Sequence, residues 1–150
     1  MMAAARVVDI LLVEDSPDDI FFTKDAFARS RFRNRLHVVE DGEKALKFLR
    51  RAGEYANAPR PHLILLDLNL PKKSGQQVLA EIRADEMLTG LPVVILTTSR
   101  DESDILRSYR HHANCYITKP LDVQEFMDIV TSIEYFWFSV AMLPSEPRGI

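Results

Sequence analysis

The stretch LILLDLNLP, residues 63–71, gives the clearest indication of the fold. Its first four residues form a short, continuously apolar run, and an acidic residue, Asp67, follows this run directly. Three other stretches share this design: LLVEDS (11–16), VVILTTS (93–99) and CYITKP (115–120). Runs rich in Leu, Ile and Val are typical of strands that are covered on both faces of a parallel sheet. Ligands of an open parallel sheet bind beyond the carboxyl ends of its strands. We therefore expect the polar groups that end these runs to meet in one pocket.

The rest of the chain alternates between two apolar periods. Strands are expected at 7–13, 35–40, 62–67, 92–97 and 115–118, and amphipathic helices near 17–30, 42–52, 75–86, 101–112 and from residue 122 onward. Five repeats of strand and then helix predict an α/β fold with a doubly wound, five-stranded parallel sheet. The expected architecture is (βα)5, flavodoxin-like, with strand order 2-1-3-4-5.

Three helix starts carry capping signals in the sequence: Ser16 before Pro17 and with Asp19 three residues on, Ser74 with Gln77 three residues on, and Asp122 with Glu125 three residues on. One insertion separates the second helix from the third strand. It is the polar stretch RRAGEYANAPRP, residues 50–61, where Pro59 and Pro61 predict a loop without a helix.

Length and composition suggest one domain. The chain has 150 residues, 47% of them hydrophobic, and a net charge of −3. We expect a single domain over residues 1–143, with a last helix over about 122–143, and a flexible tail over 144–150. No long basic run is present, so nucleic acid is not an expected direct partner. Cys115 is the only cysteine, and we interpret it as a buried small hydrophobe.

The amino-terminal stretch resembles a signal peptide only superficially. Asp9 breaks its apolar run, and the acidic EDSPDD (14–19) stands where a small-residue cleavage site would be needed. No apolar run approaches the length that spans a bilayer, so no membrane contact is expected. A single cysteine is compatible with a reducing compartment. The expectation is a soluble, cytoplasmic protein.

The polar strand ends have the chemistry of phosphoryl transfer onto a carboxylate. Asp67 can attack phosphorus, provided that a divalent ion offsets the repulsion between the two charges. Mg²⁺ prefers oxygen ligands, and Asp15 and Asp67 are the natural direct ones. Glu14 has a longer stem and is expected to reach the ion through water. The backbone carbonyl of Asn69 could complete the set of protein ligands.

Two further strand ends supply charge and a hydroxyl. Lys119, followed by Pro120, would place a positive charge on the phosphoryl oxygens, and Thr97 would donate its hydroxyl. Each of these groups alone also has an ordinary explanation, such as a helix cap, a surface lysine or a strand hydroxyl. Their joint position at the carboxyl ends of successive strands favours a common cause.

These residues resemble the receiver domain of two-component response regulators over about residues 8–143. The acid pair, Asp67, Thr97 and the Lys119-Pro120 pair stand in the family's order. The resemblance implies that Asp67 is the phosphoacceptor, that Asp15 and Asp67 bind magnesium with the Asn69 carbonyl, and that Thr97 and Lys119 contact the phosphoryl group. It also implies that Tyr116 is an aromatic switch coupled to Thr97. The alternative for Tyr116 is a plain aromatic at the sheet edge.

A narrower resemblance joins the chain to the small single-domain receivers paired with phytochrome-type histidine kinases. The stretches GEYANAPRPHLILLDLNLPKKSG (53–75), ANCYITKP (113–120) and EYFWF (134–138) carry it. Thr98 departs from the family pattern, in which many members have a smaller alanine. That departure leaves the lifetime of the acyl phosphate open.

The last helix suggests an interface. Val123, Phe126, Met127, Val130 and Ile133 follow helical spacing and are expected to face the sheet. Beyond them, apolar residues would surround the helix: Tyr135, Phe136, Trp137, Phe138, Val140, Met142 and Leu143. An exposed apolar patch usually marks a contact surface, so we predict a homodimer through this segment. The alternative is that the segment folds back on its own domain.

The function expected from the sequence is that of a single-domain response regulator, not of an enzyme. It would accept a phosphoryl group on Asp67 from a sensor histidine kinase, with Mg²⁺, and signal through a conformational switch. The rivals are a phosphorelay shuttle and an inactive, receiver-like adapter. A phosphatase with an aspartate nucleophile would need an acid two residues after Asp67, where this chain has Asn69.

Overall fold

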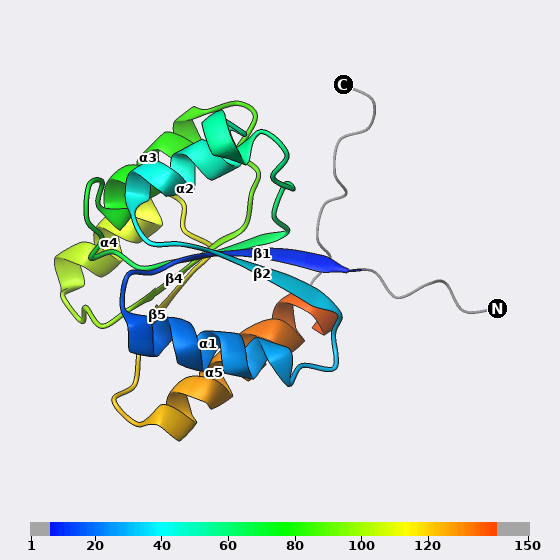
Figure 1. Ribbon diagram of the computed structural model, residues 1–150. Helices are drawn as coiled ribbons and strands as arrows, with labels where there is room; N and C mark the ends of the chain where they lie inside the picture. The colour runs from blue at the N-terminus through cyan, green and yellow to red at the C-terminus, as the bar shows by residue number, and fades with distance from the viewer. Residues whose placement is uncertain (1–6, 141–150) are drawn as a thin grey trace.

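A computed structural model describes residues 7–140 of the chain. Within this range one parallel sheet has the strand order β2-β1-β3-β4-β5 (Figure 1). The strands are β1 (Val8–Val13), β2 (Asn34–Val39), β3 (Leu63–Leu66), β4 (Val93–Thr97) and β5 (Cys115–Thr118). The predicted doubly wound α/β fold and its strand order are confirmed.

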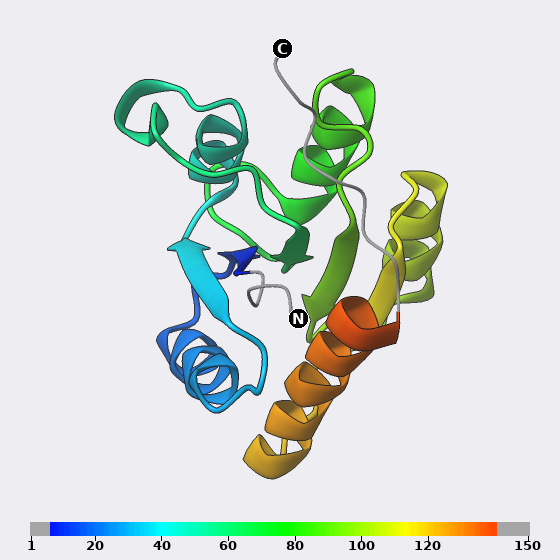
Figure 2. The same ribbon diagram turned by 90° about the vertical axis from the view of Figure 1, so that its right-hand side faces the viewer.

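Helices connect the parallel strands and cover both faces of the sheet, as parallel pairing requires. They are α1 (Pro17–Ala28), α2 (Gly42–Leu49), α3 (Gly75–Ala84), α4 (Glu102–Arg110) and α5 (Val123–Tyr135). Helices α1 and α5 lie on one face, and α2, α3 and α4 lie on the other (Figures 1 and 2). The first four helices begin and end within a few residues of their expected bounds.

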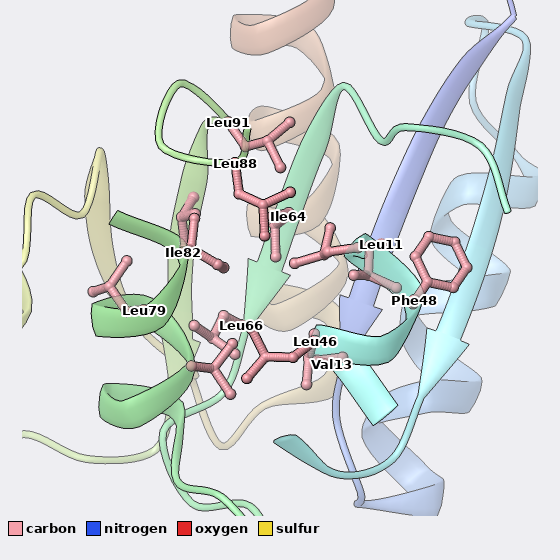
Figure 3. Close-up of a cluster of buried hydrophobic side chains, with 14 of the residues drawn as sticks. Leu11, Val13, Leu46, Phe48, Ile64, Leu66, Leu79, Ile82, Leu88 and Leu91 are labelled. Atoms are coloured by element: carbon pink, nitrogen blue, oxygen red, sulfur yellow. The ribbon is translucent and has the colours of Figure 1, made fainter. Parts of the chain in front are cut away.

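The core has two halves, because successive side chains of a strand point to opposite faces. Leu11 and Val13 of β1 belong to the half under α2 and α3 (Figure 3). Ile10 and Leu12 belong to the half that α1 and α5 cover. Both sets are buried, so β1 is a central strand that holds its carboxyl end firmly in place.

The three capping signals are confirmed. The hydroxyl of Ser16 accepts a hydrogen bond from the N–H of Asp19, and the carboxylate of Asp122 accepts one from the N–H of Glu125. At α3, the side chains of Ser74 and Gln77 each accept from the other's backbone N–H, which is a full capping box. Helix starts on the site side of the sheet are therefore set by local hydrogen bonds.

The insertion at 50–61 differs from its prediction, because it contains a short 3-10 helix, Gly53–Tyr55. The Tyr55 ring packs against Phe48 of α2, with ring centroids 5.5 Å apart. Pro59 and Pro61 restrict only the residues next to them, so they leave the earlier part of the insertion free to turn.

The last helix bears out part of its expected pattern. Phe126, Val130 and Ile133 are buried against the sheet, but Val123 is 45% exposed. The prediction for Val123 was wrong, because the first turn of α5 offers its apolar side to solvent and the buried stripe begins one turn later. Cys115 was also expected to be buried and is half-buried at the edge strand β5.

The aromatic segment divides into two parts. A π-helical turn, Phe136–Val140, continues α5. Tyr135 and Phe136 are 55% and 50% exposed, whereas Trp137 and Phe138 pack half-buried on the core of their own domain. Within the described residues, Tyr135 and Phe136 are therefore exposed as predicted, whereas the fold-back alternative holds for Trp137 and Phe138. The side chain of Val140, residues Met142 and Leu143, and the tail 144–150 lie outside the described residues.

Between residues 7 and 140, none of the helices combines the length and the apolar character that crossing a membrane would require.

Candidate metal centre

The candidate site lies at the carboxyl ends of β1 and β3, which are neighbours in the sheet. The ladder of backbone hydrogen bonds continues one residue past each strand. The N–H of Glu14 donates to the carbonyl of Val39 at 3.0 Å, and the N–H of Asp67 donates to that of Val13 at 3.1 Å. Both acidic residues are thus held by the sheet itself, and Asp15 follows Glu14 directly.

Glu14, Asp15 and Asp67 form an acid cluster. Each contributes one carboxylate oxygen, and these oxygens all lie within 4.8 Å of one another. Glu14 and Asp67 are buried, whereas Asp15 is exposed and opens the cluster to solvent. Buried carboxylates at this separation repel each other unless a positive charge joins them, and oxygen donors are what Mg²⁺ and Mn²⁺ prefer. The donor set therefore fits a hard divalent cation.

The Lys119 ammonium reaches this cluster from the end of β5. Its Nζ donates to Asp67 Oδ2 at 3.2 Å, to Glu14 Oε2, and to Asp19 Oδ2 at 2.8 Å. Its backbone N–H donates to the carbonyl of Thr97 at 2.7 Å, which ties β5 to β4 at this edge. The bond between Lys119 and Pro120 is trans, as are all peptide bonds in the described part of the chain.

Asp19 is the site residue that sequence reasoning did not identify as functional. Its position three residues after Ser16 was explained by the cap alone. An acidic residue in the first turn of a helix is common, because it interacts favourably with the helix dipole. The sequence therefore offered no signal that separates a partner of Lys119 from an ordinary first-turn aspartate.

The electrostatics of the site follow from burial and from its excess of carboxylates. Burial raises the pKa of Glu14 to about 7; Lys119 opposes this shift and the charge of Asp67 adds to it. Burial alone would lower the pKa of Lys119, but the hydrogen bond to Asp19 and the charges of Asp67 and Glu14 raise it. Lys119 therefore carries a permanent positive charge. Because this single ammonium contacts three carboxylates, the site has an excess of negative charge.

Asn69 and Thr97 lie at the same edge. The backbone N–H of Asn69 donates to Asp67 Oδ1 at 3.3 Å, which places this backbone beside the cluster. Thr97, buried at the end of β4, accepts a bond from the N–H of Ser99 at 3.5 Å. Because β3 and β4 are paired, the threonine and the Asp67 carboxylate end adjacent strands.

Tyr116 connects β5 to the loop that follows Thr97. Its hydroxyl donates to the carbonyl of Ser99 at 2.9 Å, and its ring packs partly buried on the core. The Ser99 hydroxyl in turn donates to Asp104 Oδ2 of α4 at 2.6 Å. Hydrogen bonds thus connect Thr97 through the loop at Ser99 to Tyr116 of β5 and to Asp104 of α4.

The arrangement can bind a divalent cation and hold a carboxylate nucleophile beside an ammonium. Asp67 has one oxygen bonded to Asn69 and the other to Lys119, so its position is well defined. A positive charge next to both a carboxylate and an incoming anion lowers the barrier to attack by that carboxylate. The geometry therefore suits group transfer of an anionic group onto Asp67.

Comparison with known proteins gives concordant results. The family model "Response regulator receiver domain" matches residues 10–131. Response regulator Rcp1 of Synechocystis sp. is 47% identical over 136 residues, which cover 91% of this chain and 92% of Rcp1. The crystal structure of the phosphorylated cyanobacterial phytochrome response regulator RcpA has a TM-score of 0.91 and 51% identity, covering 93% of this chain and 100% of that one. For the Mn²⁺-bound form of Rcp1 the TM-score is 0.89 and the identity 46%, with 92% and 99% covered.

Proposed function

The chain belongs to the response regulator receiver domain family, and from this premise we propose that it accepts a phosphoryl group on Asp67 from the histidine of a sensor kinase. The observation that carries the proposal is the contact of Asp67 with both the acid cluster and the Lys119 ammonium. A carboxylate oxygen of Asp67 attacks phosphorus, the bond from phosphorus to the histidine nitrogen breaks, and an acyl phosphate forms as the imidazole leaves.

Mg²⁺ is the proposed cofactor. Glu14, Asp15, Asp67 and the backbone carbonyl of Asn69 would hold it, and a solved relative, Rcp1, is described in a Mn²⁺-bound form. When bound, the ion supplies positive charge that offsets the repulsion between Asp67 and the phosphoryl donor. Lys119 donates to one phosphoryl oxygen, and the hydroxyl of Thr97 donates to another.

Signalling follows from the contacts beyond Thr97. When its hydroxyl turns toward the phosphoryl group, it releases the N–H of Ser99 and shifts the loop that Tyr116 holds. Tyr116 then changes position, so that loop, β5 and α4 move between two states. Asp67, Thr97 and Lys119 are thus the reacting set, and Thr97 with Tyr116 is the switch.

The donor is proposed to be a phytochrome-type histidine kinase in the cytoplasm. RcpA is described as a phytochrome response regulator, and the similarity covers nearly all of both chains. The protein takes part in its own phosphorylation and dephosphorylation and turns over no separate substrate. Two copies are proposed to pair through the last helix, for which the exposed Tyr135 and Phe136 are the support.

The test is incorporation of one phosphoryl group. The protein is incubated with Mg²⁺ and acetyl phosphate and its intact mass is measured. We expect a gain of one phosphoryl group, which Asp67→Asn and chelation of Mg²⁺ both abolish. Asp18→Asn is the control, because it removes an exposed carboxylate near the site and should leave the gain intact.

No gain in the unmodified chain, or an equal gain in Asp67→Asn, would contradict the proposal and favour the inactive adapter. Transfer of the phosphoryl group from Asp67 to an added histidine phosphotransfer protein, at a rate faster than its hydrolysis by water, would instead identify a phosphorelay shuttle.

A further inference from the structure

Asp19 is the one carboxylate partner of Lys119 outside the acid cluster, among the residues described. Its Oδ2 lies 2.8 Å from the lysine Nζ, closer than the 3.2 Å that separates this Nζ from Asp67 Oδ2. It sits in the first turn of α1, whereas Glu14 and Asp67 follow strands of the sheet. The cluster of oxygens that could share a cation includes Glu14, Asp15 and Asp67 but not Asp19.

The other two partners of Lys119 belong to the acid cluster. The ammonium contacts Glu14 Oε2 and Asp67 Oδ2. A divalent cation at the cluster would be coordinated by the same two carboxylates. Two positive charges on shared oxygens oppose each other. The lysine side chain is only 4% exposed, so it cannot turn into water when the cation takes its partners. A buried ammonium needs an acceptor that remains.

The Asp19 carboxylate is available for this task. In a full capping box it would bond back to the N–H of Ser16, but that N–H donates to Glu14 Oε1 at 3.0 Å. The hydroxyl of Thr23 donates to the Asp19 backbone carbonyl at 2.7 Å and helps to fix this turn of α1. The side chain of Asp19 is 26% exposed, so it can bear its charge without the lysine.

We propose that Asp19 is a positioning residue that retains the Lys119 ammonium when a divalent cation draws on Glu14 and Asp67. The lysine then stays beside the acceptor carboxylate and does not oppose the cation. This inference rests on the proposed role of the acid cluster as a metal site. Without Asp19, the ammonium has acceptors only inside the cluster, and cation binding must displace it at greater cost.

The test is a double-mutant cycle read out as Mg²⁺ affinity by calorimetry. Asp19→Asn is expected to weaken Mg²⁺ binding by about ten-fold, the size of a coupling between contacting charged groups. Asp18→Asn removes the same charge from the same helical turn at an exposed position, and it should change the affinity by about two-fold or less. In a Lys119→Met background, no ammonium competes with Mg²⁺ for the carboxylates. Asp19→Asn should then lower the Mg²⁺ affinity no more than Asp18→Asn does.

Three results would overturn the inference. One is an equal loss from Asp19→Asn and Asp18→Asn, and another is an equal loss from Asp19→Asn with and without Lys119. The third is an absence of Mg²⁺ binding in the unmodified chain, which would also remove the proposed metal site, whereas the first two leave it standing. If Lys119→Met does not fold, judged by circular dichroism, Asp19→Glu decides: restored affinity supports the inference, and affinity as low as that of Asp19→Asn overturns it.

Discussion

The buried ammonium of Lys119 and the buried carboxylate of Asp9 are charged residues at opposite ends of the sheet. Lys119 contacts acids from β1, β3 and α1, and its environment is short of positive charge. Asp9 is balanced, since Arg35 donates to it through Nε at 2.9 Å and Nη2 at 3.1 Å, and His37 Nε2 lies 3.0 Å away. Loss of one member of a balanced buried pair leaves an uncompensated charge and destabilises the fold, whereas an excess of carboxylates favours the binding of a cation.

The Asp9 carboxylate should make part of the free energy of unfolding sensitive to acid. Burial works to raise its pKa, but the hydrogen bonds and charges of Arg35 and His37 outweigh burial and lower the pKa below the ordinary 3.8. The stabilisation is therefore fully present above pH 3.8 and is lost as the pH falls through the lower, folded value. Asp9→Asn should reduce the free energy of unfolding near neutral pH by about 1 to 2 kcal/mol, a modest figure because solvent screens Arg35.

Urea unfolding at several pH values measures this difference. The gap between the unmodified chain and Asp9→Asn should narrow as the pH falls below 3.8. A gap that stays constant down to the acid transition would show that Asp9 contributes through packing and not through its charge.

At the scale of the elements, the start of α3 is fitted against the end of β3. A Cβ at Gly75 would lie 2.2 Å from the carbonyl oxygen of Asp67 and 2.6 Å from the Cα of Leu68. Both are backbone atoms that cannot move aside cheaply. The N–H of Gly75 also donates to the carbonyl of Leu68 at 2.9 Å. Glycine at this position lets the helix approach closely enough to hold the loop that carries Asp67.

Gly75→Ala is expected to reduce the free energy of unfolding by about 1 to 3 kcal/mol through overpacking, and to slow the proposed phosphorylation of Asp67. Gly90→Ala is the matched control, because a Cβ there meets no atom within 4 Å. Urea unfolding and the intact-mass assay measure the two effects. Equal behaviour of both variants would mean that the close approach of α3 has no energetic consequence.

Most elements could be predicted from local sequence, and the exceptions show why some could not. The capping box of Ser74 and Gln77 is a contact between neighbours in sequence, so its signature is visible without a fold. The turn Gly53–Tyr55 is too short to show a period, and Tyr55 packs on Phe48 of another element. Val123 fits the apolar stripe of α5, yet its exposure depends on how far the sheet extends under the helix.

For the whole molecule, the proposed pairing of two copies centres on the end of α5. An apolar groove of about 550 Å³ lies between β5 and α5, lined in part by Ile117, Ile133 and Trp137. Phe136 also lines it, and Tyr135 lies next to Phe136 and is exposed as well. Exposed aromatics next to an apolar groove are the usual anchors of an interface.

Replacing Tyr135 and Phe136 together by serine is expected to raise the dissociation constant of the proposed dimer by more than about ten-fold, because interface anchors of this kind carry much of the binding energy. Light scattering over a concentration series measures it. Phe21→Ser is the control, since Phe21 is 65% exposed on α1, away from this groove. The substitutions leave Trp137 and Phe138 on the core, so they should not disturb the packing of the domain. An unchanged mass distribution would eliminate the dimer.

The sequence by itself determined the order of strands and helices, the sheet order, the helix caps, and which polar groups end the strands. The element order and the caps are encoded by apolar period and by short-range hydrogen bonds, whereas the sheet order was expected because it is a common order of doubly wound folds. Parallel pairing then brings the strand ends to one edge. Only the tertiary structure decided that Lys119 contacts Asp19, that Arg35 and His37 balance Asp9, and that Trp137 and Phe138 return to their own core. Lys119 and Asp19 are 100 residues apart in the chain, and such contacts depend on packing that no local pattern records.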